Sequence, residues 1–99
     1  MTLEIEFDAI RFLPGALDYV RMGALPGGMH NNRDFAECVV EKTRSFDAGR
    51  EALLYDPQTS GGLLVTLPPG DAAELERTLE GAYSIGRVVE RAAKPIRLV

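Results

Sequence analysis

The most informative part of this chain is the stretch Leu54-Tyr-Asp-Pro-Gln-Thr-Ser-Gly-Gly-Leu-Leu-Val-Thr-Leu67. Its first residues end an apolar segment with helical character, and residues 63–67 are apolar or β-branched, which predicts a buried strand. Between them, Pro57 fixes its own φ and moves Asp56 out of the helical region. Gly61 and Gly62 allow positive φ and close approach by another group. The stretch therefore predicts a tight helix-to-strand connection with more special residues than a simple connection needs.

Length and composition indicate one small domain. The chain has 99 residues, of which 45% are apolar and 26% are charged. That composition is sufficient for one hydrophobic core, although a domain of this size buries a modest share of its surface. The formal net charge is −4 and the basic residues are scattered. A nucleic-acid or anionic-membrane partner usually requires a clustered basic face, so these partners are not expected.

Cysteine usage and hydropathy predict the compartment. The one cysteine, Cys38, cannot form an intrachain disulfide, which fits a reducing compartment. No apolar run approaches the length of a membrane span, and the N-terminus has no signal-peptide pattern. We therefore expect a cytoplasmic protein.

The N-terminal third predicts a strand, a helix and a glycine-rich loop. Residues 3–7 alternate apolar and acidic side chains, which predicts a half-buried strand with Leu3, Ile5 and Phe7 inward. Because the chain starts almost directly in this strand, we expect an excised piece of a longer protein. Residues 14–23 predict a short helix, with Leu13, Leu17 and Val20 in the core.

The segment 24–32 predicts a loop, because Pro26-Gly27-Gly28 is a strong turn signal and Asn31 favours a turn. The sequence leaves open whether this loop is a plain connection or faces a ligand. Residues 38–43 favour a strand, in which Cys38 is expected to be a small core residue. Asp47 is expected to cap a helix over residues 48–55.

The C-terminal third predicts one helix and two strands. Residues 71–81 follow the 3.6-residue period, and Gly81 lies near the end of this helix. Residues 83–89 predict a strand in which Gly86 marks a bulge or a close backbone approach. Residues 95–99 predict a final strand. The chain as a whole predicts an α+β fold, with a mixed or largely antiparallel sheet of about four to five strands and about three helices packed on it.

Few side chains outside residues 56–62 could carry chemistry. His30 is the one histidine and lies in an expected turn, and no acidic cluster has the spacing of a metal site. We therefore assign no catalytic residue and no metal ligand. Backbone N–H groups around Gly61 and Gly62 can form a nest for phosphate. The helix-loop-strand order and the missing lysine differ from a P-loop, so a plain connection and a ligand contact stay equally open.

The run Asp56-Pro57-Gln58-Thr59-Ser60-Gly61-Gly62, followed by Leu63-Leu64, resembles the signature of selenide, water dikinase, also called selenophosphate synthetase. The signature lies in the C-terminal domain of that family, which has the aminoimidazole ribonucleotide (AIR) synthetase-like fold. Three further stretches agree in order and spacing: Leu13-Pro14-Gly15-Ala16-Leu17, Pro26-Gly27-Gly28 with Asn31-Asn32-Arg33, and Ile85-Gly86-Arg87-Val88. The resemblance implies that residues 1–99 are a single domain, namely most of this C-terminal domain without the N-terminal catalytic ATP-binding domain.

The resemblance implies a parent enzyme of selenium metabolism, a magnesium-dependent kinase of the transferase class. It makes selenophosphate from selenide, ATP and water and releases AMP and phosphate. The family's cysteine or selenocysteine nucleophile, its lysine and most of its magnesium-binding aspartates lie outside this chain, and Cys38 does not match the nucleophile. We therefore expect this fragment to hold no cofactor, to be inactive alone, and to have the absent ATP-binding domain as its partner within a homodimeric parent.

The resulting site hypothesis concerns two loops. Thr59, Ser60, Gly61 and Gly62 are expected to shape the phosphate end of an interdomain cleft, and three residues are expected on the same side: Gly27, Gly28 and Asn31. One alternative is a stand-alone, non-catalytic interaction or regulatory domain with the same fold. Another is a related enzyme such as a thiamine-phosphate kinase or a purine-pathway ATPase, against which the Gln58-Thr59-Ser60 core argues.

Overall fold

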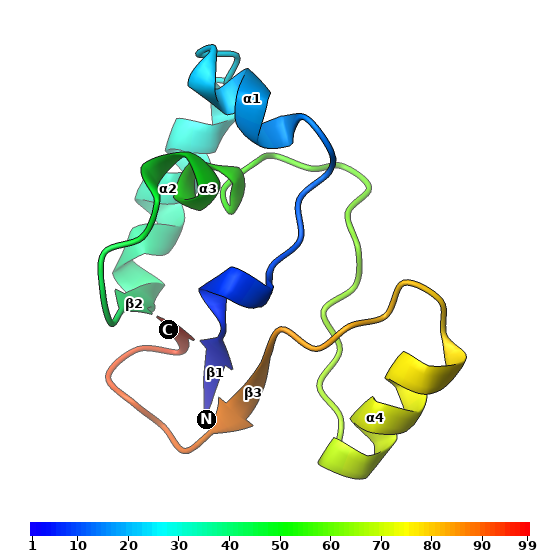
Figure 1. Ribbon diagram of the computed structural model, residues 1–99. Helices are drawn as coiled ribbons and strands as arrows, with labels where there is room; N and C mark the ends of the chain where they lie inside the picture. Colours follow the sequence, from blue (N-terminus) through cyan, green and yellow to red (C-terminus); the bar gives the residue numbers. More distant parts are fainter.

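The computed structural model describes residues 1–99 and has an α+β architecture with one mixed sheet and four α-helices (Figure 1). The sheet has the order β2-β4-β1-β3. Its strands are β1 (Thr2–Ile5), β2 (Val40–Lys42), β3 (Gly86–Val89) and β4 (Ile96–Leu98). Strand β1 is antiparallel to β3 and parallel to β4, and β4 is parallel to β2. The predicted α+β class with a mixed sheet is confirmed, and the sheet is not purely antiparallel.

The helices are α1 (Ala16–Arg21), α2 (Gly28–Ala36), α3 (Ala48–Leu53) and α4 (Pro69–Thr78), with 3₁₀ turns η1 (Phe7–Ala9) and η2 (Glu37–Val39). The predicted cap of α3 is confirmed, because Asp47 Oδ1 accepts a hydrogen bond from the Arg50 backbone N–H at 2.9 Å. This bond satisfies one of the free N–H groups at the helix start.

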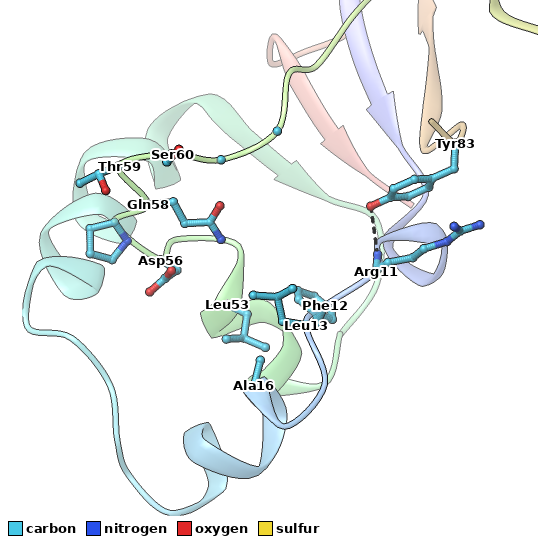
Figure 2. A pocket seen from close by; sticks show the side chains of 13 residues that line it. Arg11, Phe12, Leu13, Ala16, Leu53, Asp56, Gln58, Thr59, Ser60 and Tyr83 are labelled. Carbon is cyan, nitrogen blue, oxygen red and sulfur yellow. Dashed lines mark hydrogen bonds between the residues drawn. The ribbon is translucent and has the colours of Figure 1, made fainter. Parts of the chain in front are cut away.

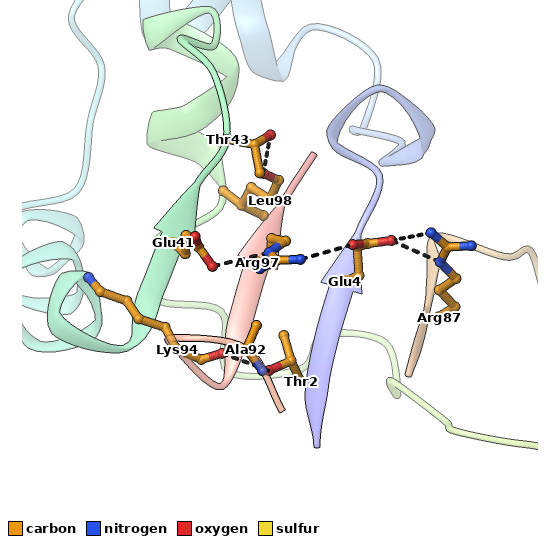
Figure 3. A network of polar contacts seen from close by, with 9 residues as sticks. All are labelled: Thr2, Glu4, Glu41, Thr43, Arg87, Ala92, Lys94, Arg97 and Leu98. Atoms are coloured by element: carbon orange, nitrogen blue, oxygen red, sulfur yellow. Dashed lines mark hydrogen bonds and ion pairs between the residues drawn. The ribbon is translucent and has the colours of Figure 1, made fainter. Parts of the chain in front are cut away.

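One face of the sheet carries a row of opposite charges, shown in Figure 3. Arg87 lies 2.7 Å from Glu4, and Arg97 lies 3.6 Å from Glu4 and 3.1 Å from Glu41. The hydrogen bond and charge of Glu41 raise the pKa of Arg97. The two residues of each pair face each other on neighbouring strands. The observed register therefore places each arginine opposite a glutamate.

The hydrophobic core lies on the other face and is small. Met29, Ala52 and Tyr55 form a buried cluster between α2 and the end of α3. Phe7 is also buried and its ring lies 4.4 Å from that of Phe46. A hollow of about 250 Å³, lined only by apolar side chains, separates the sheet from α2 and α3. The buried cluster thus packs α2 against the end of α3, and the hollow lies between these helices and the sheet.

Helix α4 and the segment before it stand apart from this core, which overturns one prediction. Residues 63–67 form no strand, and Leu63 is 93% exposed. The two sides of β1 are occupied by β3 and β4, so the centre of the sheet has no free position for another strand. The segment instead runs away from the sheet to α4 (Figure 1).

Other predictions are wrong in detail. Leu13 is 81% exposed rather than buried, and it borders the open cavity described below. Cys38 lies exposed in η2 instead of in a strand core. Residues 28–32 belong to α2 and not to a loop, with Gly27 at the N-cap. The predicted close backbone approach at Gly86 is confirmed, since a Cβ there would overlap the carbonyl oxygen of Glu4.

Candidate functional site

The signature loop borders a cavity of about 770 Å³ (Figure 2). Three separate parts of the chain form its wall: the segment before α1, the end of α3 with the loop after it, and one aromatic side chain near β3. The lining residues are Arg11, Phe12, Leu13, Ala16, Leu53, Asp56, Pro57, Gln58, Thr59, Ser60, Gly61, Gly62 and Tyr83. Every signature residue from Asp56 to Gly62 therefore lines this one cavity.

The loop begins with a tight turn around Pro57. The Gln58 backbone N–H donates to the Asp56 carbonyl at 2.8 Å, which closes a three-residue turn. From Thr59 to Gly62, no backbone N–H donates to any acceptor in the protein. Four consecutive N–H groups are therefore free for water or for a ligand at the cavity wall.

The two glycines of the loop differ in their surroundings. A Cβ on Gly61 would lie 2.8 Å from Oε1 of Gln58, so the Gln58 amide occupies the place of a side chain. A Cβ on Gly62 would meet nothing within 4 Å. Neither glycine has a positive φ. The contact at Gly61 is with the flexible end of the Gln58 side chain, and neither glycine uses the freedom to adopt a positive φ.

The second predicted loop lies next to the first but outside the cavity. A Cβ on Gly28 would lie 3.4 Å from Cγ of Pro57, so the start of α2 packs directly on the signature. Asn32 Nδ2 donates to the Tyr55 carbonyl at 3.0 Å, just before the loop. Gly27 and Asn31 are exposed and do not line the cavity. Helix α2 therefore holds the base of the loop.

Arg11 and Tyr83 are site residues that the sequence did not reveal. The Arg11 guanidinium lies 4.2 Å from the centroid of the Tyr83 ring. The Tyr83 hydroxyl accepts a hydrogen bond from the Arg11 backbone N–H at 3.3 Å. Figure 2 shows this pair across the cavity from Thr59 and Ser60. The two residues are 72 positions apart, and no local pattern connects them.

The lining carries few charged side chains. Arg11 is its one basic side chain and Asp56 its one acidic side chain, and neither forms an ion pair. Cys38 and His30 lie elsewhere, so the cavity contains no thiol and no imidazole. No group of three or more His, Cys, Asp or Glu side chains is arranged to hold a metal ion. Free N–H groups, hydroxyls and one guanidinium are the donors that the wall offers.

The groups with displaced pKa values lie outside this cavity. Hydrogen bonds from Arg50 and Arg44 lower the pKa of Asp8, and a hydrogen bond to Glu51 raises the pKa of Lys42. Burial raises the pKa of Tyr55. These shifts arise from ion pairs and packing that hold the fold together, so they do not mark a catalytic group.

Comparison with known proteins identifies relatives of this chain, although no family model matches it. A selenide, water dikinase of Clostridium botulinum (strain Eklund 17B / Type B) is 39% identical over 99 residues, covering 96% of this chain and 29% of that protein. One from Shewanella sp. (strain W3-18-1) is 43% identical over 84 residues, covering 84% of this chain and 23% of that protein. One from Pelobacter propionicus is 43% identical over 82 residues, covering 78% of this chain and 24% of that protein.

These relatives confirm the resemblance that the signature predicts. The chain spans less than a third of the length of the relatives it matches. No helix of the structure has the length and apolar character needed to cross a membrane.

Proposed function

We propose that this chain, a homologue of one segment of the selenide, water dikinases, is the C-terminal domain of such an enzyme and shapes the phosphate end of an interdomain cleft. In this proposal, the parent makes selenophosphate from selenide, ATP and water. Thr59, Ser60, Gly61 and Gly62 face the cleft, with Gly27, Gly28 and Asn31 supporting the same side. The absent N-terminal domain supplies ATP, magnesium and the reacting groups.

The observation that supports this proposal is the row of four free N–H groups from Thr59 to Gly62. Phosphate oxygens accept several hydrogen bonds at once, and backbone N–H groups that have no partner within the chain are available to donate to them. The hydroxyls of Thr59 and Ser60 add donors, and Arg11 adds the positive charge. The donors lie in an open cavity, which a second domain can close.

The same lining explains why we expect no activity from the chain alone. Phosphoryl transfer depends on metal ions that neutralise the developing charge, and this chain gathers no acidic cluster to hold them. It also presents no activated nucleophile beside the loop. Incubation of the purified chain with ATP and selenide should release no AMP above background, measured by chromatography of the nucleotides.

A chimeric enzyme tests the role of the loop. Residues 1–99 replace the matched segment of the Clostridium botulinum relative, and Gly61→Leu is introduced, with Gly70→Leu as the matched control. A Cβ on Gly70 meets nothing within 4 Å, whereas one on Gly61 displaces the Gln58 amide. We expect Gly61→Leu to reduce selenophosphate formation at least about tenfold with an unchanged melting temperature. Equal activity of the two variants would show that the loop is only a connection.

The alternative, a non-catalytic interaction domain, is favoured by one observation. Large apolar side chains are exposed outside the cavity, among them Leu63, Phe35 and Met22. Such surfaces on a soluble domain commonly mark contacts with other proteins. If the chimera with wild-type residues 1–99 forms no selenophosphate although it folds and binds ATP, this alternative replaces the enzymatic one.

A further inference from the structure

Arg11 supplies the one positive charge among the residues that line the cavity, and Asp56 supplies the one negative charge. Arg11 forms no ion pair, unlike most arginines of this chain. Without its charge, the lining would carry only the carboxylate of Asp56, which repels an anionic ligand. Binding of an anion in this cavity therefore depends on where the Arg11 guanidinium is held.

Tyr83 contacts Arg11 at two points. The guanidinium lies 4.2 Å from the centroid of the Tyr83 ring, a distance at which a cation is attracted to the face of an aromatic ring. At the other end of the residue, the Arg11 backbone N–H donates to the Tyr83 hydroxyl at 3.3 Å. The contact with the ring uses none of the N–H donors of the guanidinium, so these donors stay free for an anion.

The two residues belong to segments that few other contacts join. The chain leaves the cavity at Gly62, continues through α4 and returns to the cavity at Tyr83. From Leu63 to Ser84, the hydrogen bond between Arg11 and Tyr83 is the one that reaches the rest of the chain. A free arginine side chain loses rotamer freedom when it binds a ligand, and the contact with the ring removes part of that cost beforehand.

We propose that Tyr83 is a positioning residue that holds the Arg11 guanidinium at the cavity wall, where its charge attracts an anionic ligand to the loop donors. Figure 2 shows the pair across the cavity from Thr59 and Ser60, so the charge and the loop approach the ligand from opposite sides. A charge at that position acts almost equally on the bound substrate and on the transition state, so it strengthens binding without speeding the transfer. The inference rests on the proposed function, in which the ligand is the phosphate end of ATP.

The chimeric enzyme described above tests the charge. Arg11→Gln removes it, and Arg91→Gln is the matched control, because Arg91 is also exposed and free of ion pairs but lies outside the cavity. At low ionic strength, Arg11→Gln should raise the KM for ATP at least about tenfold with little change in kcat. This difference should shrink at about 0.5 M salt, because screening shortens the range of the charge. Arg91→Gln should leave both constants unchanged.

Substitutions of Tyr83 test the positioning role. Tyr83→Leu removes the aromatic face and should raise the KM for ATP about two- to fivefold. Tyr83→Phe keeps the face and should stay within about twofold of the wild-type chimera. The double variant Arg11→Gln/Tyr83→Leu should match Arg11→Gln alone, because the ring then has no guanidinium to hold. If Tyr83→Leu lowers the melting temperature, Tyr83→Met takes its place, since methionine also lacks an aromatic face.

The possible failures can be told apart. In an active chimera that Gly61→Leu impairs, equal KM values for Arg11→Gln and Arg91→Gln would overturn this inference and leave the proposed function standing. Additive effects of the Arg11 and Tyr83 substitutions would show that Tyr83 acts on the fold and not through Arg11, which overturns the positioning role. A wild-type chimera that folds but forms no selenophosphate would overturn the proposed function and this inference together.

Discussion

Among the glycines of this chain, Gly86 is the one where an added methyl group should cost the most stability. The Cβ would overlap the carbonyl oxygen of Glu4 and lie 3.0 Å from the Glu4 carbonyl carbon and from Ile5 Cα. These neighbours are backbone atoms of β1, which cannot rotate away as a side chain can. Strands β1 and β3 must therefore separate near Ile5, at one end of their pairing.

The magnitude follows from this geometry. Overpacking a rigid neighbour costs about 1–3 kcal/mol, and the upper end applies because backbone must shift. For a domain of this size, about 3 kcal/mol corresponds to a fall in Tm of roughly 12–24 °C. The loss matters because β1 joins β3 to the rest of the sheet, whose order is β2-β4-β1-β3.

Thermal unfolding followed by circular dichroism measures the effect, with Gly62→Ala as the matched control. Gly62 has no neighbour within 4 Å of its Cβ position and no positive φ. The control should therefore be neutral or stabilising by about 0.4–1 kcal/mol, through the lower entropy of the unfolded chain. A Gly86→Ala variant that melts within a few degrees of Gly62→Ala would refute the close approach of β1 and β3.

Three further outcomes follow from the fold. Met29→Ala removes a side chain that is 2% exposed and should cost about 2–5 kcal/mol in urea unfolding, whereas Met22→Ala, at a 77% exposed position, should cost nothing measurable. Asp47→Ala removes the cap of α3 and should cost about 1 kcal/mol by the same assay. Hydrogen bonds from Arg50 and Arg44 lower the pKa of Asp8 in the folded protein below 3.8. The ionised Asp8 therefore stabilises the fold above pH 3.8, and this stabilisation is lost as the pH falls through the folded-state pKa. Asp8→Asn should flatten the dependence of Tm on pH in this acid range, and an unchanged slope would show that Asp8 contributes no stability.

Local signals predicted the features that depend on a few neighbouring residues. Asp47 caps α3 because its side chain reaches an N–H three residues later, and such a bond is visible in sequence. The turn at Pro57 follows in the same way from the fixed φ of proline. The sequence left open whether Asp56 to Gly62 form a plain connection or contact a ligand, and in the structure these residues border a cavity.

Features that depend on distant parts of the chain could not be predicted in this way. Arg11 meets Tyr83 only because η1 and the chain before β3 end on the same side of the sheet, which is a property of topology. The segment 63–67 has the composition of a buried strand, and composition does not say whether a partner edge is free. In this structure β4 holds the place beside β1 that such a strand would take. The buried strand predicted for residues 63–67 is therefore wrong, because the segment pairs with no strand of the sheet.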